Sequence, residues 1–573
     1  MHRLRASYAV SSGALELILM WHMHQPDYRD HASGEFTLPW VYLHALKDYS
    51  DMAAHLERHP RVRAVVNFVP VLLDQLEDYA AQFATGTWRD PLLRLLAAPD
   101  LGELSAAERK LVLDSCFRGS HVSMIEPYPR YKRLRELFRI TEEGDAAAQA
   151  YLSGAFLADL ITWYHLAWSG ETLRRRGALI AELMAKGEGY SHADRMGLIA
   201  LIADAVRDII PRYRALAAGG RIEISTTPHT HPLAPLLIDF ASAREAAPNA
   251  PLPVAACYPG GRARTTAQIA SAMASHAARF NAAPAGVWPA EGAVSNAFLE
   301  LLAASGCRWT AASESVLAAS LRQAAPVLPP REHYLYRPYN VAGAPGISMF
   351  FRDEKLSDLI GFEYRHWHGK DAAADFVERL HAIRRQVPAG ETAVVTVILD
   401  GENAWEHYPY NGYYFFEDLY SLLDADPDIS TTTCADYIAR NPHAAGSLPG
   451  VVAGSWVFGT FSTWIGHPDK NRAWDLLCAA KETYDLVIGS GRLPTNEDRA
   501  ATAQLAVCES SDWFWWFGDI NLAADVASFD RLFRLNLSNL YQRLKVAPPA
   551  NLAAPLSQGG GHPEGGGAMR RAT

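Results

Sequence analysis

Short continuous runs of apolar residues recur along the chain and predict buried strands. They occupy residues 15–20, 62–69, 221–226, 286–291, 309–313, 346–351 and 393–399, with a weaker candidate at 252–256. Continuous hydrophobicity is typical of parallel strands that are covered on both faces. Segments with helical spacing, such as residues 265–281 and 371–386, lie between these runs. The order predicts an α/β fold with helices around a parallel sheet, and the number of units favours a closed barrel.

Two long segments interrupt this alternation. Residues 91–217 consist mostly of helix formers and predict a helical insertion in a barrel loop, and residues 415–547 are again mostly helical and rich in aromatic side chains. The last residues contain two GGG runs and little that could be buried, which predicts a disordered tail. We therefore expect three regions: an α/β barrel at residues 1–410, a helical domain at 411–548 and a disordered tail at 549–573.

Composition and charge exclude several classes of protein. Among 573 residues, 49% are hydrophobic and 20% are charged, which is ordinary for a globular protein. A net charge of -10 without a long basic run argues against nucleic acid or an anionic membrane as a partner. No apolar run is long enough to span a bilayer, and no glycine-rich phosphate loop follows a predicted strand.

The cysteines and the first residues bear on the compartment. The six cysteines are scattered, with no CxxC pair and no metal-type spacing, which favours free thiols in a reducing environment. The apolar stretch after Arg3 and Arg5 contains Glu16 and leads directly into a polar cluster, so it is typical of a core strand and not of a secretion signal. We expect a cytoplasmic protein.

Two carboxylates follow predicted strands and are the candidate catalytic residues. Glu291 ends the segment GVWPAE, and Asp400 comes directly after the run at 393–399. Active sites of such barrels lie at the carboxyl ends of the strands. Cleavage of a glycosidic bond needs two carboxyl groups, one at the anomeric carbon and one at the leaving oxygen. Each residue could instead cap the helix that follows, but both stand in aromatic, glycine-flanked segments, which favours catalysis.

Two pairs of histidines need separate treatment. His22 and His24 are two residues apart, as are His229 and His231, so each pair would face one side of a strand. Four imidazoles could bind zinc and would suit a metal-dependent carbohydrate esterase. Such sites usually include a nearby carboxylate, and Gln25 and Pro26 separate Asp27 from His24. We therefore expect sugar contacts here and no metal.

Tryptophans are candidate sugar platforms because sugar C–H faces pack on indole rings. The best placed have glycines and polar residues as neighbours: Trp288, Trp405, Trp456 and Trp464. The cluster WFWW at 513–516 has aromatic side chains on every face, so much of it should be core. Asp512, which precedes it, could touch a sugar hydroxyl or cap a helix.

Several of these segments together resemble glycoside hydrolase family 57. They are HMHQP at 22–26, GVWPAE at 286–291, LDGENAWE at 399–406, GSW at 454–456 and ESSDWFWWFGD at 509–519, in the order in which the family has them. The resemblance extends over roughly residues 15 to 545, and the later segments are most similar to the amylopullulanase-like branch. It implies an incomplete (β/α)7 barrel followed by a helical domain that closes the active-site cleft.

The resemblance also implies an activity and the roles of residues. Family members act on α-glucans with retention of configuration and without a required metal or other cofactor. Glu291 would be the nucleophile and Asp400 the general acid/base, about 5–5.5 Å apart. His24 and Gln25, and less clearly His22, would contact the sugar. Glu402 could raise the pKa of Asp400 by like-charge repulsion, or it could be a solvated side chain.

The sequence therefore predicts a retaining hydrolase of starch, glycogen or maltodextrin, acting on α-1,4 bonds and, as an alternative, also on α-1,6 bonds. Transfer by the same pair, as in a 4-α-glucanotransferase or a branching enzyme, remains an alternative. A metal-dependent carbohydrate esterase and a catalytically silent glucan-binding protein are two others. An α-glucan is the expected partner, and nothing in the sequence indicates an oligomeric state.

Overall fold

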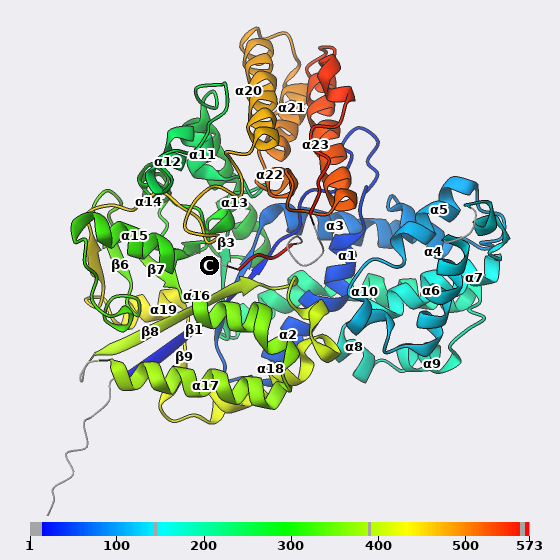
Figure 1. The fold of residues 1–573 in the computed structure, drawn as a ribbon, viewed down its shortest axis with the longest axis horizontal. Helices are drawn as coiled ribbons and strands as arrows, with labels where there is room; N and C mark the ends of the chain where they lie inside the picture. Colours follow the sequence, from blue (N-terminus) through cyan, green and yellow to red (C-terminus); the bar gives the residue numbers. More distant parts are fainter. Residues whose placement is uncertain (1–13, 143–145, 388–390, 562–567, 572–573) are drawn as a thin grey trace, which may run out of the picture.

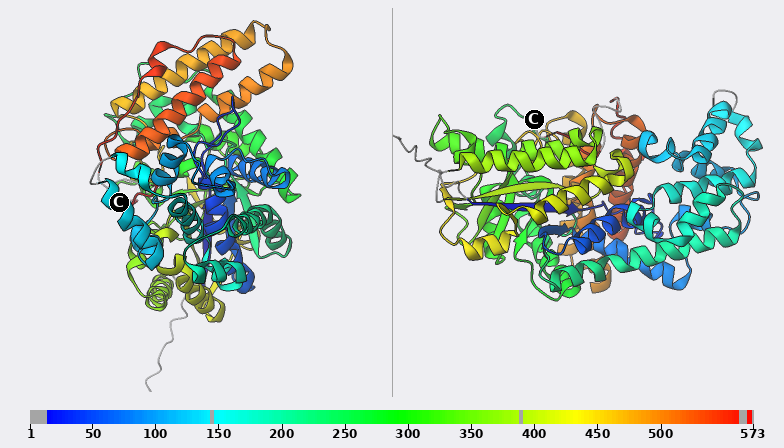
Figure 2. Two further views of the ribbon diagram at one scale, coloured as in Figure 1. Left: turned by 90° about the vertical axis from the view of Figure 1, so that its right-hand side faces the viewer. Right: turned by 90° about the horizontal axis from the view of Figure 1, so that it is seen from below.

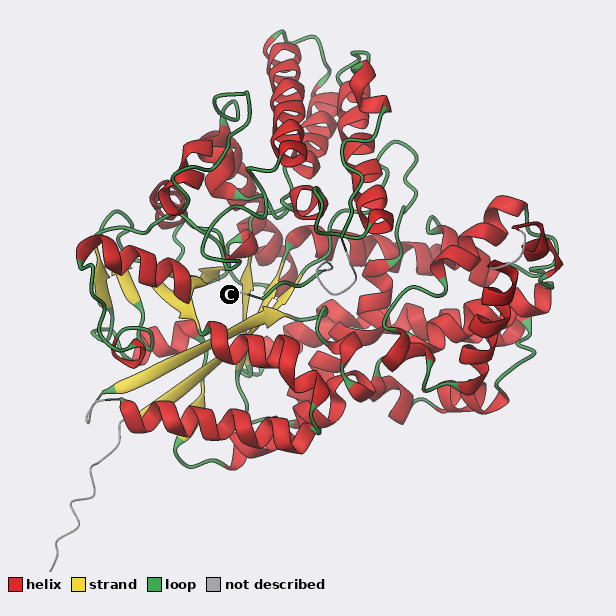
Figure 3. Ribbon diagram, in the orientation of Figure 1, coloured by secondary structure: helices red, strands yellow, loops and turns green. Residues whose placement is uncertain are grey.

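The computed structural model describes residues 14–142, 146–387, 391–561 and 568–571. Within these residues, seven parallel strands form a closed barrel (Figures 1 and 3). The strands, in their order around the barrel, are β1 (Ala14–Met23), β2 (Ala64–Phe68), β3 (Ile222–Thr226), β4 (Gly286–Val287), β5 (Trp309–Ser313), β7 (Ser348–Arg352) and β8 (Thr392–Asp400). Pairing of β7 with β8 and of β8 with β1 closes the ring. The expected (β/α)7 fold is confirmed.

Helices surround the barrel as the spacing of apolar residues predicts. Those outside the insertion and the C-terminal region are α1 (Trp40–His44), α2 (Ser50–Arg58), α3 (Pro70–Thr85), α11 (Ala234–Ile238), α12 (Ala243–Ala246), α13 (Gly261–Phe280), α14 (Asn296–Ala304), α15 (Glu314–Ala324), α16 (Glu354–Asp358) and α17 (Gly369–Gln386). The weak strand candidate at 252–256 is wrong. That segment is irregular because Pro251 precedes it and Pro253 lies within it, and proline cannot donate to a strand ladder.

Three further strands lie outside the barrel ring. β6 (Tyr339–Val341) runs antiparallel to β7, β10 (Gly446–Leu448) pairs with β6, and β9 (Ile429–Thr431) pairs with β1. The chain after residue 410 therefore first completes the sheet. Its helix α18 (Tyr413–Ala425) packs along α17, and α19 (Cys434–Arg440) follows β9. Two short strands in a largely helical stretch carry little signal in the sequence.

The segment between β2 and β3 forms the helical mass on the right of Figure 1. Its helices are α4 (Pro91–Ala97), α5 (Ala106–Ser115), α6 (Pro129–Glu142), α7 (Gly154–Ala167), α8 (Glu171–Arg176), α9 (Ala178–Lys186) and α10 (His192–Ala218). Capping boxes formed by Ser105 with Glu108 and by Ser191 with Asp194 begin α5 and α10. The long helix α10 contacts α3 and β3 and so joins the insertion to the barrel.

Four helices near the C-terminus stand over one side of the barrel (Figure 2). They are α20 (Pro468–Gly489), α21 (Thr495–Cys508), α22 (Asp512–Trp516) and α23 (Ala523–Arg543). Glu509, which is fully buried just before α22, accepts hydrogen bonds from Arg264 of α13 at 2.6 and 3.0 Å and from the Tyr258 hydroxyl at 2.7 Å. This buried ion pair fixes α22 relative to the barrel.

The C-terminal residues differ from the expected disordered tail where the structure describes them. Leu552 and Leu556 are buried, and the backbone N–H groups of Gly560 and Gly561 donate to the carbonyl oxygen of Asn521. Residues 562–567 and 572–573 lie outside the described residues, so the prediction is not tested there. Glycine runs mark this segment of the sequence, so the burial of Leu552 and Leu556 beside α23 could not be predicted from it. Within the described residues, no helix is both long and apolar enough to cross a bilayer.

Candidate active site

The carboxyl ends of β1, β2 and β8 bring the first polar side chains together. The parallel register aligns His22 of β1 with Asp400 of β8 on one side and with Asn67 of β2 on the other. Asn67 is fully buried and His22 nearly so. A barrel directs such strand-terminal residues to one end, and the predicted site residues His22 and Asp400 lie there.

Glu291 lies in a strained turn after β4. Its φ of 59° and ψ of 21° are left-handed, which is uncommon for a residue with a side chain, and Gly292 follows with φ 58°. A Cβ on Gly292 would come within 2.9 Å of the Trp288 ring. The turn directs the carboxylate to Trp456, whose indole Nε1 donates to Oε2 at 3.1 Å, and to Ser511, whose hydroxyl lies 3.2 Å from Oε1.

Asp400 is the last residue of β8 and is partly exposed. The Asn403 side-chain amide donates to its Oδ2 at 2.9 Å. Burial raises the pKa of Asp400 to about 6, against the opposing effects of the Asn403 hydrogen bond and the Arg352 charge. Such a carboxyl group is able to keep a proton close to neutrality, as a general acid must.

Glu291 and Asp400 influence each other's ionisation. Burial, followed by the charges of Asp512 and Asp400, raises the pKa of Glu291 to about 8, although Trp456 and Ser511 oppose the rise. In this structure Glu291 therefore holds its proton more firmly than Asp400. The order is opposite to the one the predicted roles need when a substrate is bound. Between the two pKa values the pair carries a single proton, which belongs to the pair and not to one residue.

His231 connects the barrel histidines to Glu291. His22 Nδ1 lies 2.6 Å from the carbonyl oxygen Oδ1 of Asn67, so that nitrogen carries a hydrogen. His22 Nε2 lies 3.3 Å from His231 Nε2, and His231 Nδ1 lies 2.9 Å from the Ser511 hydroxyl. Together with the bond from Ser511 to Glu291, these contacts form a continuous hydrogen-bonded chain from Asn67 to the carboxylate.

This series of hydrogen bonds couples the protonation of Glu291 to the protonation and tautomers of His22 and His231. Burial lowers the pKa of His22 to about 3 and that of His231 well below its usual value, so both rings are neutral. With His22 accepting at Nε2, His231 donates there and accepts at Nδ1 from Ser511. The single Ser511 proton is then shared between His231 and an ionised Glu291. The hydrogen bond from Ser511 favours ionised Glu291 and so opposes the rise in the pKa of Glu291 that burial causes.

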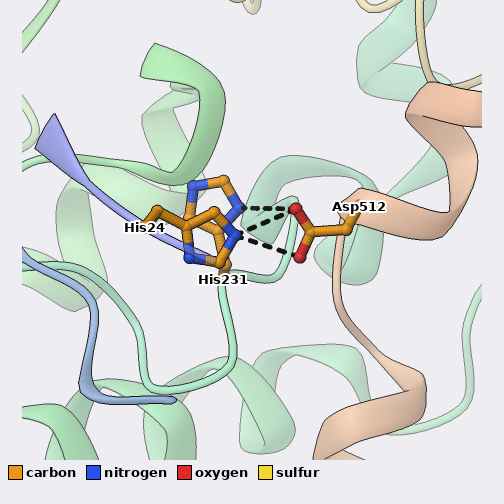
Figure 4. Close-up of side chains that lie close together, drawn as sticks. All are labelled: His24, His231 and Asp512. Carbon is orange, nitrogen blue, oxygen red and sulfur yellow. Dashed lines mark hydrogen bonds and ion pairs between the residues drawn. The ribbon is translucent and has the colours of Figure 1, made fainter. Parts of the chain in front are cut away.

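A second group of side chains surrounds His24. Its Nε2 lies 2.9 Å from Asp512 Oδ1, and its ring stacks on that of His231 with centroids 3.8 Å apart (Figure 4). Its Nδ1 is buried and, within the described chain, has no hydrogen-bond partner. The backbone N–H of His24 and the side chain of Gln25 donate to Glu402 Oε1 at 3.3 and 3.4 Å.

Glu402 is buried, contrary to the solvated alternative. Burial, followed by the Asp400 and Asp48 charges, raises its pKa well above the usual value. This rise favours the protonated form of Glu402, which adds no charge beside Asp400. Its contacts with His24 and Gln25 indicate a role in shaping the loop after β1.

His229 lies apart from the other three histidines. Its Nε2 contacts Asp74 of α3 at 2.9 Å, and its Nδ1 accepts from Ser271 of α13 at 2.8 Å. The expectation that His229 and His231 face one side of a strand is wrong. Pro228 and Pro232 hold the segment in a turn, with His231 at φ 60°. The structure therefore does not form the four-histidine metal site that the spacing allowed.

Three side chains of the site lie close enough together to form a smaller metal site. One nitrogen each of His24 and His231 and a carboxylate oxygen of Asp512 all lie within 4.8 Å of one another. Two of these groups already bind each other, and His231 Nδ1 is occupied by Ser511. A metal there would have to replace both contacts, so the hydrogen-bonded arrangement is the one these side chains fit.

The four predicted tryptophans fall into two groups. Trp456 is partly buried and bonds to Glu291, and Trp288 lies behind it with ring centroids 5.4 Å apart. Trp405 is almost fully buried between Trp21 and Phe416 and donates to the Gly401 carbonyl. Trp464 is likewise fully buried, against Trp515. Neither Trp405 nor Trp464 offers an exposed face to a sugar, because each fills the core beneath the site.

Sequence reasoning missed two residues that reach Glu291 or its surroundings, Ser511 and Asn67. Ser511 stands beside Asp512 in a motif that was recognised, so its position was a usable signal. Asn67 ends a strand, but a lone asparagine in an apolar run gives little indication of its partner. Arg352 donates to the Ile398 carbonyl at 2.8 Å and lies over Trp456, and only the folded barrel brings these together.

A parallel barrel with two carboxyl groups at one mouth, one buried and one partly exposed, flanked by tryptophan and histidine, is the arrangement expected of a carbohydrate-active enzyme of the glycosidase type. The model of glycosyl hydrolase family 57 matches residues 18–446, and the chain belongs to that family. A comparison with curated protein sequences finds no match.

Several solved structures have a similar fold. The branching enzyme of Pyrococcus horikoshii is 16% identical with a TM-score of 0.55, covering 93% of this chain and 94% of its own. The α-amylase AmyC of Thermotoga maritima is 14% identical with a TM-score of 0.55, covering 94% and 95%. The 4-α-glucanotransferase of Thermococcus litoralis is 13% identical with a TM-score of 0.51, covering 94% and 61%. At these identities the likeness establishes the fold.

Proposed function

We propose that the protein cleaves α-glucans with retention of configuration, with Glu291 as nucleophile and Asp400 as general acid/base. The observation that carries the proposal is the pairing of the buried Glu291 with the partly exposed Asp400 at one barrel mouth, close enough for the Asp400 charge to raise the pKa of Glu291. Membership of glycosyl hydrolase family 57 supports the class of reaction. The three similar structures, which are named as α-glucan enzymes, support the substrate class.

The reaction would proceed by two displacements. In the first, Asp400 donates its proton to the glycosidic oxygen while Glu291 attacks the anomeric carbon, which breaks the glycosidic bond and forms a glycosyl ester. In the second, Asp400 removes a proton from water, or from a sugar hydroxyl, and the oxygen displaces Glu291. Each displacement inverts the anomeric centre, so the product has the configuration of the substrate.

The first step requires an ionised Glu291 and a protonated Asp400. Because the pair holds one proton between the two pKa values, this form needs only a shift of the proton from Glu291 to Asp400. The Trp456 indole and the Ser511 hydroxyl favour the ionised Glu291. The positive charge that develops on the sugar in the transition state favours it further.

The remaining predicted contacts are assigned by their free hydrogen-bonding groups. His24 has an unpartnered buried Nδ1 among the described residues and is the best candidate to bind a sugar hydroxyl. Trp456 is the best candidate for a sugar platform next to Glu291, while Asp512 and His231 hold their neighbours in place. We propose an intracellular enzyme that needs no cofactor, with hydrolysis of α-1,4 bonds as the main activity and α-1,6 cleavage or transfer as its alternatives.

Product analysis tests this proposal. Purified protein is incubated with maltoheptaose, pullulan and glycogen, and the products are resolved by chain length. Shorter maltooligosaccharides alone indicate hydrolysis, and maltotriose from pullulan indicates α-1,6 cleavage. Products both shorter and longer than maltoheptaose indicate glucanotransfer. No product from any of the three would contradict the proposal and favour a glucan-binding protein or an esterase.

A further inference from the structure

The described end of the C-terminal segment reaches the active site. Figure 1 shows the last red stretch of chain leaving the region of α23 and turning towards the barrel. Arg570 lies over the indole ring of Trp515, with the guanidinium carbon 4.4 Å from the ring centroid, and is near enough to Glu291 to feel its charge. Trp515 belongs to α22, the helix whose first residue, Asp512, contacts His24.

The segment is attached on both sides of the site. Met569 packs against the hydrophobic core. Arg571 forms an ion pair with Glu363 and lies over the ring of Phe362, with 5.3 Å to its centroid. Phe362 and Glu363 follow β7 and α16 on the barrel, whereas Trp515 belongs to the C-terminal helices. Arg570 and Arg571 therefore connect the C-terminal helices to the barrel, with Arg570 near Glu291.

Arg570 has unused hydrogen-bonding capacity. A guanidinium has five N–H groups, and the contact with the Trp515 carbonyl, at 3.4 Å from Nη2, is long. Its Nε is buried and has no hydrogen-bond partner within the part of the chain that the structure describes. Burial of a donor without an acceptor is unfavourable, and a buried orphan in a native protein usually marks a place for water or a ligand.

Among the described residues, the nearby acceptor groups already have hydrogen-bond donors of their own. Both oxygens of Glu291 already accept hydrogen bonds, from Trp456 and Ser511. The other neighbouring cation, Lys470, is occupied by the carbonyl oxygens of Thr463 and Phe514. A ligand that suits Arg570 must therefore bring its own acceptor oxygens, as the hydroxyl groups of a sugar do.

We propose that Arg570 is a substrate-binding residue, which donates hydrogen bonds to the hydroxyl groups of a glucose unit held between α22 and the barrel rim. The inference rests on the proposed action on α-glucans. It extends the binding site to a residue near the end of the chain, outside the residues 18–446 that the family model matches. The C-terminal segment is then a wall of the cleft.

The test compares Arg570→Ala and Arg570→Lys with the wild type and with Arg492→Ala, which removes one exposed charge from the loop between α20 and α21. KM and kcat are measured with maltoheptaose. We expect Arg570→Ala to raise KM about tenfold, the loss typical of a charged hydrogen bond, with kcat changed less than KM. Arg570→Lys should give an intermediate KM, because lysine keeps the positive charge but lacks the planar set of N–H donors of the guanidinium. Arg492→Ala should behave as the wild type.

Thermal melting of each variant distinguishes binding from folding, and we expect a melting temperature close to that of the wild type. An unchanged KM in Arg570→Ala would overturn the inference. A lower KM would also overturn it, because the segment would then compete with the glucan for the cleft. Failure of the proposed function is seen separately, as a wild-type protein without turnover of any α-glucan; that result would remove the basis of this inference too.

Discussion

The barrel and the C-terminal helices contribute different chemistry to one site. The barrel places the two groups that would react, Glu291 and Asp400, at the ends of β4 and β8. The chain after residue 450 supplies Trp456 and Ser511, which hydrogen-bond to Glu291. It also supplies Asp512, whose charge raises the pKa of Glu291. The barrel therefore determines where the glycosidic bond would be broken. The later part of the chain influences the protonation state of Glu291 in which this can happen.

The largest expected effect on activity comes from replacing the two carboxylates that the barrel supplies. Glu291→Gln and Asp400→Asn should each lower kcat by about 10⁴-fold or more, because each removes a group that takes part in bond making or proton transfer. Circular dichroism and thermal melting should remain those of the wild type. Glu300→Gln, which changes an exposed carboxylate paired with Arg262, is the control and should keep full activity. Activity within tenfold of the wild type in either catalytic variant would refute the assigned roles.

The next effect tests the connection between the two halves. Glu509→Gln leaves the buried Arg264 without its anionic partner and should lower the free energy of unfolding by about 3–5 kcal/mol. Urea denaturation measures this change. Loss of the exposed Arg262–Glu300 pair, by Glu300→Gln, should cost less than about 1 kcal/mol. Equal effects of the two variants would mean that the Glu509 contact does not fix α22 on the barrel.

The pH dependence tests how the later half controls Glu291. In the wild type, kcat/KM should fall below about pH 6, where both carboxyl groups are protonated and no nucleophile remains. It should also fall above about pH 8, where both are ionised and no acid remains.

Ser511→Ala sharpens this prediction. The serine hydrogen bond lowers the pKa of Glu291, so its loss raises that pKa and moves the profile to higher pH, by up to about one unit. Rates at pH 5 to 10 with maltoheptaose measure the shift. Thr463→Ala changes a hydroxyl for which no contact with either carboxylate is seen among the described residues, and it should leave the profile in place. A shift to lower pH in Ser511→Ala would contradict the hydrogen-bond argument.

The smallest effect separates the tryptophans. Trp456→Phe removes the indole donor to Glu291 and should lower kcat/KM up to about tenfold, the value of one hydrogen bond. Trp405→Phe should lower the melting temperature but leave KM for maltoheptaose unchanged, because Trp405 is enclosed by Trp21 and Phe416. A raised KM in Trp405→Phe would mean that Trp405 contacts the sugar after all, contrary to this account.

The same comparison explains what could be predicted from the sequence. Buried barrel strands carry continuous apolar runs, so β3, β5 and β8 were located to within a residue or two, and Glu291 and Asp400 stand where those patterns end. The short strands β9 and β10 and the buried segment around Leu552 carry too little local signal. Trp405 and Trp464 could not be assigned either, because an indole in the core and an indole in a cleft have the same sequence neighbours.

The hydrogen bonds and pKa shifts of the site could not be predicted from the sequence, because they depend on contacts between distant segments. His231 meets His22 and Ser511 only after a turn between two prolines reverses the chain. The sequence showed the pairs of histidines but assigned His229 to the same site. Arg570 lies in a glycine-rich stretch that predicts disorder, and only the folded chain brings it to Trp515 and Glu291.

The central claim is that Glu291 is the nucleophile of a retaining α-glucan enzyme, and trapping the covalent intermediate tests it most directly. The protein is incubated with a 5-fluoro-α-maltosyl fluoride, whose ring fluorine slows the second displacement, and is then digested and mapped by mass spectrometry. We expect one label per chain, on the peptide that contains Glu291, and no label in Glu291→Gln. A label on another residue, or an active wild type that is never labelled, would contradict the account.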